Sequence, residues 1–408
     1  MLKKSTQRKL ALYFSATIIL NGVLFWRSAH GIAIGLSDFA SFYTASEILH
    51  EGRGHQLYNL SLQEAIQRSI KPAVVAERRA VLPYNHPPFE AFMFGPMAWF
   101  SYRAADLIWL SINVGLLAAI IMILRNNLPF LGQAPLYLWV AACLAFTPIM
   151  VALIQGQDSI VLLFFYCMAF IALRRKAGFA AGVWIALGLL KFQLTLPFVA
   201  PLLLLKRWRT VAGFGAAALL LFVVSFGTVG LSGLLNYPVF VWSLERDPKF
   251  AWLEPPKMPN LRGLASSLFH PNHVRMGVAF LLVASAICLA TATFLWRKTT
   301  RDDFRNVGLA FATALIVSVL VSYHILLHDL SILFLSLALI LESVAGELAS
   351  ASRTNILISA CAALLWSPLS LILMQFRHFE CLAAILLVLL GAVLFDSRSF
   401  DTTSALQQ

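Results

Sequence analysis

Long, charge-poor stretches of hydrophobic residues alternate along the chain with short polar or charged segments. The first runs from Leu10 to Trp26, behind a basic N-terminal segment. The others lie at about 88–100, 104–124, 134–154, 158–173, 178–190, 194–205, 210–230, 274–296, 305–322, 329–345, 355–374 and 379–395. Because about 20 apolar helical residues span a bilayer, the pattern predicts an all-α polytopic membrane protein with about twelve transmembrane helices, within about 11 to 13.

The first long hydrophilic stretch, residues 28–85, contains two segments with helical spacing. One follows Asp38, and the other follows Ser61-Leu62-Gln63-Glu64, which matches a capping box. Short amphipathic helices on the outer membrane surface fit this pattern better than a separate domain does. We therefore expect one integral-membrane domain over 1–396.

Two further segments complete the predicted domain organisation. We expect residues 231–273 to form a second external loop, and residues 397–408 to form a short polar C-terminal tail.

Basic clusters predict the orientation of the spans, since lysine and arginine are enriched in cytoplasmic loops. The clusters are Arg174-Arg175-Lys176, Lys206-Arg207-Trp208-Arg209, and Arg297-Lys298 with Arg301. All three face the cytoplasm only if residues 178–205 form a hairpin of two short helices that turns near Lys191. An N-terminus on the same side also requires either that 88–100 is re-entrant or that one of the other stretches is not a span. This topology places Asp38, Gln157, Lys191 and the histidines at the outer face.

Composition supports a membrane protein and excludes a set of soluble domains. The chain of 408 residues is 60% hydrophobic and 12% charged, whereas soluble domains are about 25% charged. Its net charge of +12 fits cytoplasmic anchoring charges and contact with anionic membrane lipids, so no nucleic acid partner is expected. The five cysteines form no CxxC pair and predict neither a disulfide nor a metal framework. We expect no cofactor, although a divalent metal is not excluded.

Two charged residues beside apolar stretches are candidates for chemistry. Asp38 closely follows the first predicted span, and it can act as a general base or simply cap the helix that begins at Phe39. Lys191 interrupts an apolar stretch, so it either snorkels to water from a helix end or meets an anion such as a lipid phosphate.

Further candidates lie near the end of the apolar stretch 305–322. In Tyr323-His324 and His328-Asp329 the two imidazoles are one helical turn apart, but the glutamate of an HExxH zinc motif is absent. His324 can contact a phosphate or transfer protons, and all four residues can also be ordinary interfacial polar groups. Arg262 can bind phosphate through two nitrogens or be an exposed arginine at the rim.

Two turns complete the candidate set. Gly156-Gln157-Asp158 separates two apolar helices, which a tight turn alone explains. Tyr84-Asn85-His86-Pro87-Pro88 reads as a rigid turn, because consecutive prolines fix φ and exclude helix.

The order of these features resembles glycosyltransferase family 87, integral-membrane enzymes of the GT-C fold. The resemblance covers roughly residues 30 to 340 and rests on Asp38-Phe39, Tyr43, Gly54, Leu57-Tyr58, Tyr84 with Pro87-Pro88, Gly156-Gln157, Lys191, and His324 with Asp329. The sequence departs from the family at His86, where a tyrosine usually precedes the two prolines, and at Tyr323, where a proline is common.

The resemblance implies transfer of a sugar, such as the hexose mannose, from a polyprenyl-phosphate carrier to a lipid or glycan acceptor, with inversion. It implies an active site that faces the periplasm from a bacterial inner membrane, with Asp38 as the general base. The groups expected at the donor phosphate are Lys191, His324 and Arg262. The expected substrate pocket comprises Tyr43, Tyr84, His86, Gln157, His328 and Asp329.

Other classes of function remain open on the sequence. A transporter or flippase for a lipid-linked or anionic substrate also uses intramembrane lysine, histidine and aspartate. Transporters usually place such charges near the bilayer midplane between paired repeats, whereas here they gather at one face and no repeat is visible. An acyltransferase or an assembly scaffold is less favoured, because the chain has no HxxxxD motif and no cytoplasmic interaction domain.

Overall fold

The computed structural model is built from helices. It describes residues 3–26, 37–70, 81–253, 258–269, 271–299, 304–345 and 352–405, and within these ranges there is no strand. The α-helices are α1 (Lys4–Trp26), α3 (Phe39–His50), α4 (Leu60–Ile70), α6 (Glu90–Phe94), α7 (Tyr102–Asn127), α8 (Leu136–Ala145), α9 (Thr147–Gln155), α10 (Ser159–Arg174), α11 (Gly178–Leu187), α12 (Phe192–Leu204), α13 (Trp208–Arg246), α14 (Leu261–Leu268), α15 (Val274–Lys298), α16 (Phe304–Val321), α17 (Leu333–Ala345), α18 (Arg353–Trp366), α19 (Leu369–Gln375) and α20 (Cys381–Ala405). The predicted all-α class is therefore confirmed for these residues.

Several helices are suited to cross a membrane. By length and composition there are six in the described ranges, or up to eight if each of two bent pairs is one span. The bent pairs are α8 with α9, at 69°, and α18 with α19, at 61°. Shorter apolar helices occur at 159–174, 305–321 and 381–395. The chain is therefore an integral membrane protein.

The apolar stretch Gly178–Leu204 is long enough to count as one span, but its contacts show that it folds back. A straight helix of this length would separate its ends by about 39 Å. Yet α13 starts at Trp208, and its Thr210 lies so close to Gly182 that a Cβ there would collide with the Thr210 backbone. The reversal falls at Lys191, where the backbone leaves helical geometry (φ −119°, ψ 69°). These contacts support the predicted hairpin.

The three basic clusters meet at one end of the bundle. The Arg207 guanidinium donates to Trp296 O at 3.2 Å and to Thr299 Oγ1 at 2.9 Å, at the end of α15. Gly178, which follows the first cluster, contacts Arg209. The expectation that these clusters share one side of the protein is therefore supported, although Arg301 lies outside the described residues.

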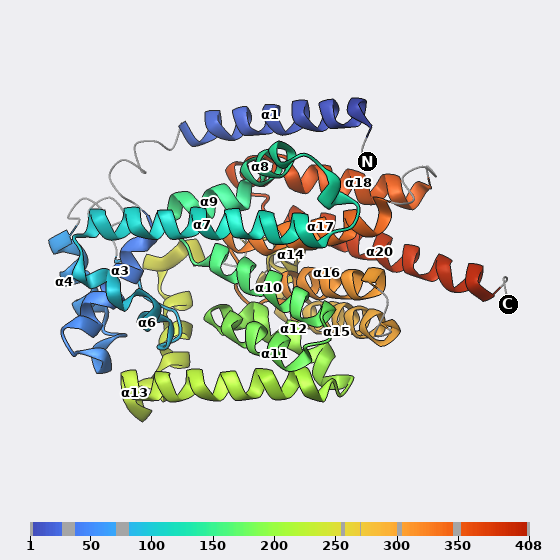
Figure 1. Ribbon diagram of the computed structural model, residues 1–408. Helices are drawn as coiled ribbons and strands as arrows, with labels where there is room; N and C mark the ends of the chain where they lie inside the picture. The colour runs from blue at the N-terminus through green and yellow to red at the C-terminus, as the bar shows by residue number, and fades with distance from the viewer. Residues whose placement is uncertain are drawn as a thin grey trace.

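The opposite end carries α3, α4 and α6, on the left in Figure 1, whereas both termini lie on the right. Residues 88–100 belong to this end. They form α6 and a 3₁₀ helix, η2 (Gly95–Trp99), both against α3. The hydroxyl of Tyr43 in α3 donates to Phe100 O at 2.7 Å. Since the segment begins and ends beside α3, it does not cross the bundle.

The capping prediction in the first external loop was wrong. The residue that caps α4 is Asn59, whose Oδ1 accepts from the amides of Ser61 and Leu62 at 3.0 and 3.2 Å. The predicted capping box at Ser61 therefore starts two residues too late. Parts of the predicted loop, 28–36 and 71–80, lie outside the described residues.

The structure also describes parts of the predicted second external loop and of the predicted C-terminal tail. The predicted loop 231–273 begins as helix, because α13 resumes after a break at Gly230 (φ 69°) and runs to Arg246. Within this loop, 254–257 and residue 270 lie outside the described residues. The predicted tail, 397–408, is helical as far as Ala405, where α20 ends.

Gly156 ends α9 in the left-handed conformation (φ 64°, ψ 36°), and a Cβ there would lie 2.7 Å from Phe39 Cβ. We expect Gly156→Ala to lower the free energy of unfolding by about 1–3 kcal/mol, from backbone strain and the clash with Phe39. Thermal unfolding in detergent measures this. The matched control is Gly115→Ala in α7, where a Cβ meets nothing within 4 Å. Equal unfolding midpoints for the two variants would contradict the expectation.

Candidate functional site

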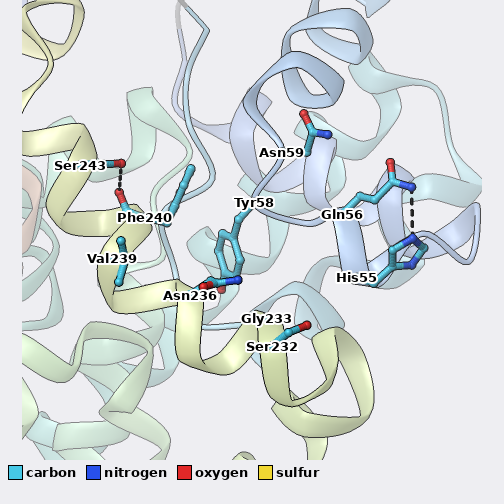
Figure 2. A pocket seen from close by; sticks show the side chains of 10 residues that line it. All are labelled: His55, Gln56, Tyr58, Asn59, Ser232, Gly233, Asn236, Val239, Phe240 and Ser243. Carbon is cyan, nitrogen blue, oxygen red and sulfur yellow. Dashed lines mark hydrogen bonds between the residues drawn. The ribbon is translucent and has the colours of Figure 1, made fainter.

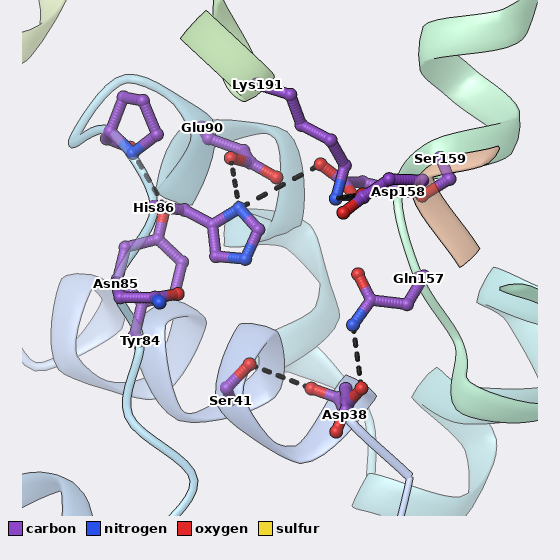
Figure 3. Close-up of polar contacts among 12 residues, drawn as sticks. Asp38, Ser41, Tyr84, Asn85, His86, Glu90, Gln157, Asp158, Ser159 and Lys191 are labelled. Carbon is purple, nitrogen blue, oxygen red and sulfur yellow. Dashed lines mark hydrogen bonds and ion pairs between the residues drawn. The ribbon is translucent and has the colours of Figure 1, made fainter. Parts of the chain in front are cut away.

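Asp38 stands at the N-cap position of α3, but its side chain does not cap the helix. Instead, Asp38 Oδ2 accepts a hydrogen bond of 2.8 Å from Gln157 Nε2 (Figure 3). Gln157 follows Gly156, whose left-handed turn brings it against the start of α3. The carboxylate is thus held at the junction of two segments distant in sequence. The capping explanation of Asp38 is correct for its position but not for its side chain.

A second glutamine at the end of α9 holds His328. Gln155 Oε1 and His328 Nδ1 lie 2.9 Å apart. His328 belongs to a 3₁₀ helix, η8 (Leu327–Ile332), and the charges of Asp38 and Lys191 both act on its imidazole. Gln155 and Gln157 therefore hold the His328 imidazole and the Asp38 carboxylate, which come from other segments, close to the end of α9.

Lys191, at the break between α11 and α12, is the central charge of the site. Its Nζ lies 2.8 Å from Asp158 Oδ1 and 2.7 Å from Asp329 Oδ1, and its side chain is 4% exposed. Asp329 Oδ2 also accepts from the amide of Leu326 at 2.8 Å. Of the alternatives open on the sequence for Lys191, the structure shows contact with an anion, in the form of two carboxylates. A contact between Lys191 and a donor phosphate remains a prediction.

Further negative charge lies beside this ion pair. His86 Nδ1 is 3.0 Å from Glu90 Oε2 and 3.9 Å from Asp158 Oδ2 (Figure 3). Burial raises the pKa of Glu90 to about 7, and the nearby Asp158 charge adds to the effect. Burial alone would raise the pKa of Asp158 as well, but the Lys191 ammonium outweighs it and lowers that pKa. The site therefore contains more buried carboxylates than Lys191 alone can neutralise.

Sequence reasoning missed Glu90 as a site residue and treated Asp158 as part of a turn. A signal for Glu90 was present, because it is the only charged residue in the apolar stretch 88–100. An ionisable group in such a stretch is costly unless it has a partner. One partner, His86, lies only four residues earlier, at a spacing that the sequence shows. The second carboxylate, Asp158, could not be placed beside Glu90 from the sequence, since it lies far along the chain.

Tyrosine hydroxyls fix the backbone of the turn that carries His86. Tyr58 Oη donates to His86 O at 2.8 Å, Tyr237 Oη to Asn85 O at 3.0 Å, and Tyr84 Oη to Pro87 O at 3.0 Å. Tyr237 belongs to α13, so this helix helps to shape the site. The turn is therefore rigid for two reasons, its prolines and these hydrogen bonds.

Two buried glutamines of α4 hold the segment that leads into this turn. Gln67 forms hydrogen bonds with both backbone groups of Leu82. Gln67 Nε2 donates to Leu82 O at 2.7 Å, and Gln67 Oε1 accepts from Leu82 N at 2.9 Å. One turn earlier, Gln63 Oε1 accepts from Tyr84 N at 2.8 Å. Side-chain amides thus take the place of a neighbouring strand. The predicted surface helix α4 supports the site structurally.

Arg262 and His324 form a neighbouring cluster. Arg262 donates through Nη1 and Nη2 to the two carboxylate oxygens of Glu245, at 3.2 and 2.9 Å, and through Nη1 to Tyr323 O at 2.7 Å. His324 Nδ1 lies 3.9 Å from Glu245 Oε1, and burial lowers the pKa of His324 to about 4. His324 is therefore neutral at neutral pH. Arg262 therefore links Glu245 of α13 to the segment that follows α16.

The structure therefore brings most of the predicted residues together. Asp38, His86, Gln157, Lys191, His328 and Asp329 surround one region, and His324 and Arg262 adjoin it through Asp329 and Glu245. Tyr84 and Tyr43 have their hydroxyls bonded to backbone, so they act first as supports.

A hollow of about 490 Å³ lies between the second half of α13 and a 3₁₀ helix, η1 (Gly54–Gln56) (Figure 2). Its lining includes amide and hydroxyl side chains, among them Gln56, Asn59 and Asn236, and the ring of Tyr58. Through the bond from Tyr58 to His86 O, one wall of this hollow is connected to the site.

Comparison with known proteins gives one match. The family model for glycosyltransferase family 87 matches residues 84–322, which is more than half of the chain. Neither a curated protein nor a solved structure matches. The matched region contains His86, Gln157, Lys191 and Arg262, whereas Asp38 precedes it.

The ion pair makes a prediction about stability. We expect Lys191→Met to lower the free energy of unfolding by about 3–5 kcal/mol, because it leaves Asp158 and Asp329 buried without a cation. Adding Asp158→Asn should restore part of the loss, since one buried charge is then removed. Thermal unfolding in detergent tests both variants, with the exposed Lys206→Met as the control. A Lys191→Met protein as stable as the parent would show that the ion pair does not hold the site together.

Proposed function

The chain belongs to glycosyltransferase family 87 and is thus a membrane glycosyltransferase, and we propose that its donor is a sugar on a polyprenyl-phosphate carrier. The sugar is a hexose such as mannose, the acceptor is a hydroxyl of a lipid or glycan, and the transfer inverts the anomeric centre. The observation that carries this proposal is Asp38, a carboxylate held by Gln157 beside the charged groups around Lys191.

The proposed topology is a GT-C-like bundle of twelve crossings with the site at the outer face. Starting from the six long helices, the count adds the two bent pairs, the three shorter apolar helices and the second arm of the α11–α12 hairpin. The clustering of basic residues at the other end supports a cytoplasmic orientation for that end. We place the protein in a bacterial inner membrane, with the site open to the periplasm.

In the proposed reaction Asp38 is the general base. Its carboxylate removes the proton of the acceptor hydroxyl, and the hydroxyl oxygen attacks the anomeric carbon. The bond from this carbon to the phosphate oxygen breaks, and the phosphate leaves with the bonding electrons. Gln157 positions the base. Its amide donates a hydrogen bond to one carboxylate oxygen of Asp38, and this bond also fixes the direction of the other oxygen.

The leaving phosphate requires positive charge or hydrogen-bond donors. We assign this role first to Arg262 and to His324, whose Nδ1 is buried and has no hydrogen-bond partner in the described parts of the chain. Lys191 does not contact the phosphate directly in this proposal, because its ammonium is paired with Asp158 and Asp329. It contributes positive charge from that position. His328, whose Nε2 lies 3.4 Å from Asp329 Oδ1, is assigned to the substrate-binding region between the base and these groups.

The sugar-transfer role of Asp38 is tested by Asp38→Asn. We expect turnover with a polyprenyl-phosphate hexose to fall by about 100- to 10,000-fold, because the amide cannot accept the proton. The thermal unfolding midpoint should change little, since the amide can still accept a hydrogen bond from Gln157. Glu51→Gln, which alters an exposed acid at the end of α3, is the control and should keep full activity. Unchanged turnover in Asp38→Asn would remove Asp38 from the mechanism.

The same reconstituted system separates an enzyme from a transporter. An enzyme releases the polyprenyl phosphate in step with glycosylated acceptor. Movement of the lipid-linked sugar across vesicles without release of the phosphate would instead favour a transporter.

A further inference from the structure

The side chains of His86, Glu90 and Asp158 converge on one small volume next to the Lys191 ion pair. One ligand atom from each lies within 4.8 Å of the other two, and Figure 3 shows all three side chains directed toward one another. The separations from His86 Nδ1 are 3.0 Å to Glu90 Oε2 and 3.9 Å to Asp158 Oδ2. Atoms bound to one metal at about 2.0–2.2 Å are spaced in this range.

An unpartnered oxygen lies at the same place. Glu90 is 1% exposed, and its Oε1 has no hydrogen-bond partner within the described ranges, nor has Asp158 Oδ2. A buried carboxylate oxygen without a donor is unfavourable, because it has lost water and gained nothing. Lys191 cannot supply the missing charge, since its ammonium is already shared by Asp158 and Asp329.

We propose that His86, Glu90 and Asp158 bind a divalent metal ion of the class of Mn²⁺ or Zn²⁺. One imidazole nitrogen and two carboxylates are a donor set suited to these ions, whereas Mg²⁺ and Ca²⁺ prefer oxygen ligands alone. The ion balances the buried negative charge that Lys191 leaves over. This inference goes beyond the proposed sugar transfer and does not depend on it, because its readout is bound metal.

The supports of the ligands are consistent with a formed site. The backbone of His86 is held by the Tyr58 hydroxyl, and its ring lies 4.8 Å from the Phe42 ring in an edge arrangement. Glu90 is in the first turn of α6, which begins shortly after the two prolines of the turn that carries His86. Asp158 is oriented by Lys191. Ligands fixed in this way lose little conformational freedom when the ion binds.

The test is metal binding by the full-length protein in detergent. After treatment with a chelator, we expect equilibrium dialysis followed by elemental analysis to find one Mn²⁺ or Zn²⁺ per chain, and the unfolding midpoint to rise when either ion is added. Mg²⁺ and Ca²⁺ should bind at least tenfold more weakly. Glu90→Gln and His86→Gln should each weaken Mn²⁺ and Zn²⁺ binding at least tenfold. His55→Gln, which changes a histidine on η1, should leave binding unchanged.

Two outcomes would overturn the proposal. One is a folded parent protein that takes up no stoichiometric Mn²⁺ or Zn²⁺, and the other is Glu90→Gln binding either ion as tightly as the parent. Glu90→Gln suits this purpose, because it keeps the shape of the side chain and removes a buried negative charge, so its fold should survive without metal. Binding of Mn²⁺ to the parent, followed by electron paramagnetic resonance, gives a result even if His86→Gln does not fold.

Discussion

The ammonium of Lys191, buried between Asp158 and Asp329, is the interaction on which the site depends. Each of these residues lies where a helix begins, ends or breaks, so their ion pairs hold the α11–α12 hairpin, the start of α10 and the start of α17 together. A buried lysine is tolerated only with such partners, and buried carboxylates only with such a cation. Charge complementarity among helix ends therefore fixes one end of a bundle whose remaining contacts are mostly apolar.

Other groups attach to this centre through hydrogen bonds rather than charge. Gln155 and Gln157 bring His328 and Asp38 toward it, and Gln63 and Gln67 do the same for the turn that carries His86. Amide side chains suit this position, because they satisfy backbone groups or ionised partners without adding to the buried charge. As a result the proposed base and the proposed metal ligands lie in one region, at the end of the bundle opposite its basic clusters.

The sequence allowed the helical class, the membrane character and the position of Asp38 before α3 to be predicted, because each depends on local hydrophobicity and charge. It also singled out Lys191 as a charge that reaches water or meets an anion, but not that two aspartates surround it, since that requires the fold. The Asn59 cap and the helical course of α13 beyond Gly230 were missed for a local reason. A single capping residue or a helix resumed after a glycine leaves little trace in hydrophobic periodicity.

If sugar transfer occurs at the Asp38 end of the bundle, a donor must bind there. An experimental structure of the protein with a non-hydrolysable polyprenyl-phosphate sugar analogue would show where the donor binds. We expect the anomeric carbon to lie on the Asp38 side of the Lys191 ion pair, with the phosphate toward His324 and Arg262. An analogue bound instead at the opposite end, beside Arg174 and Arg207, would contradict it.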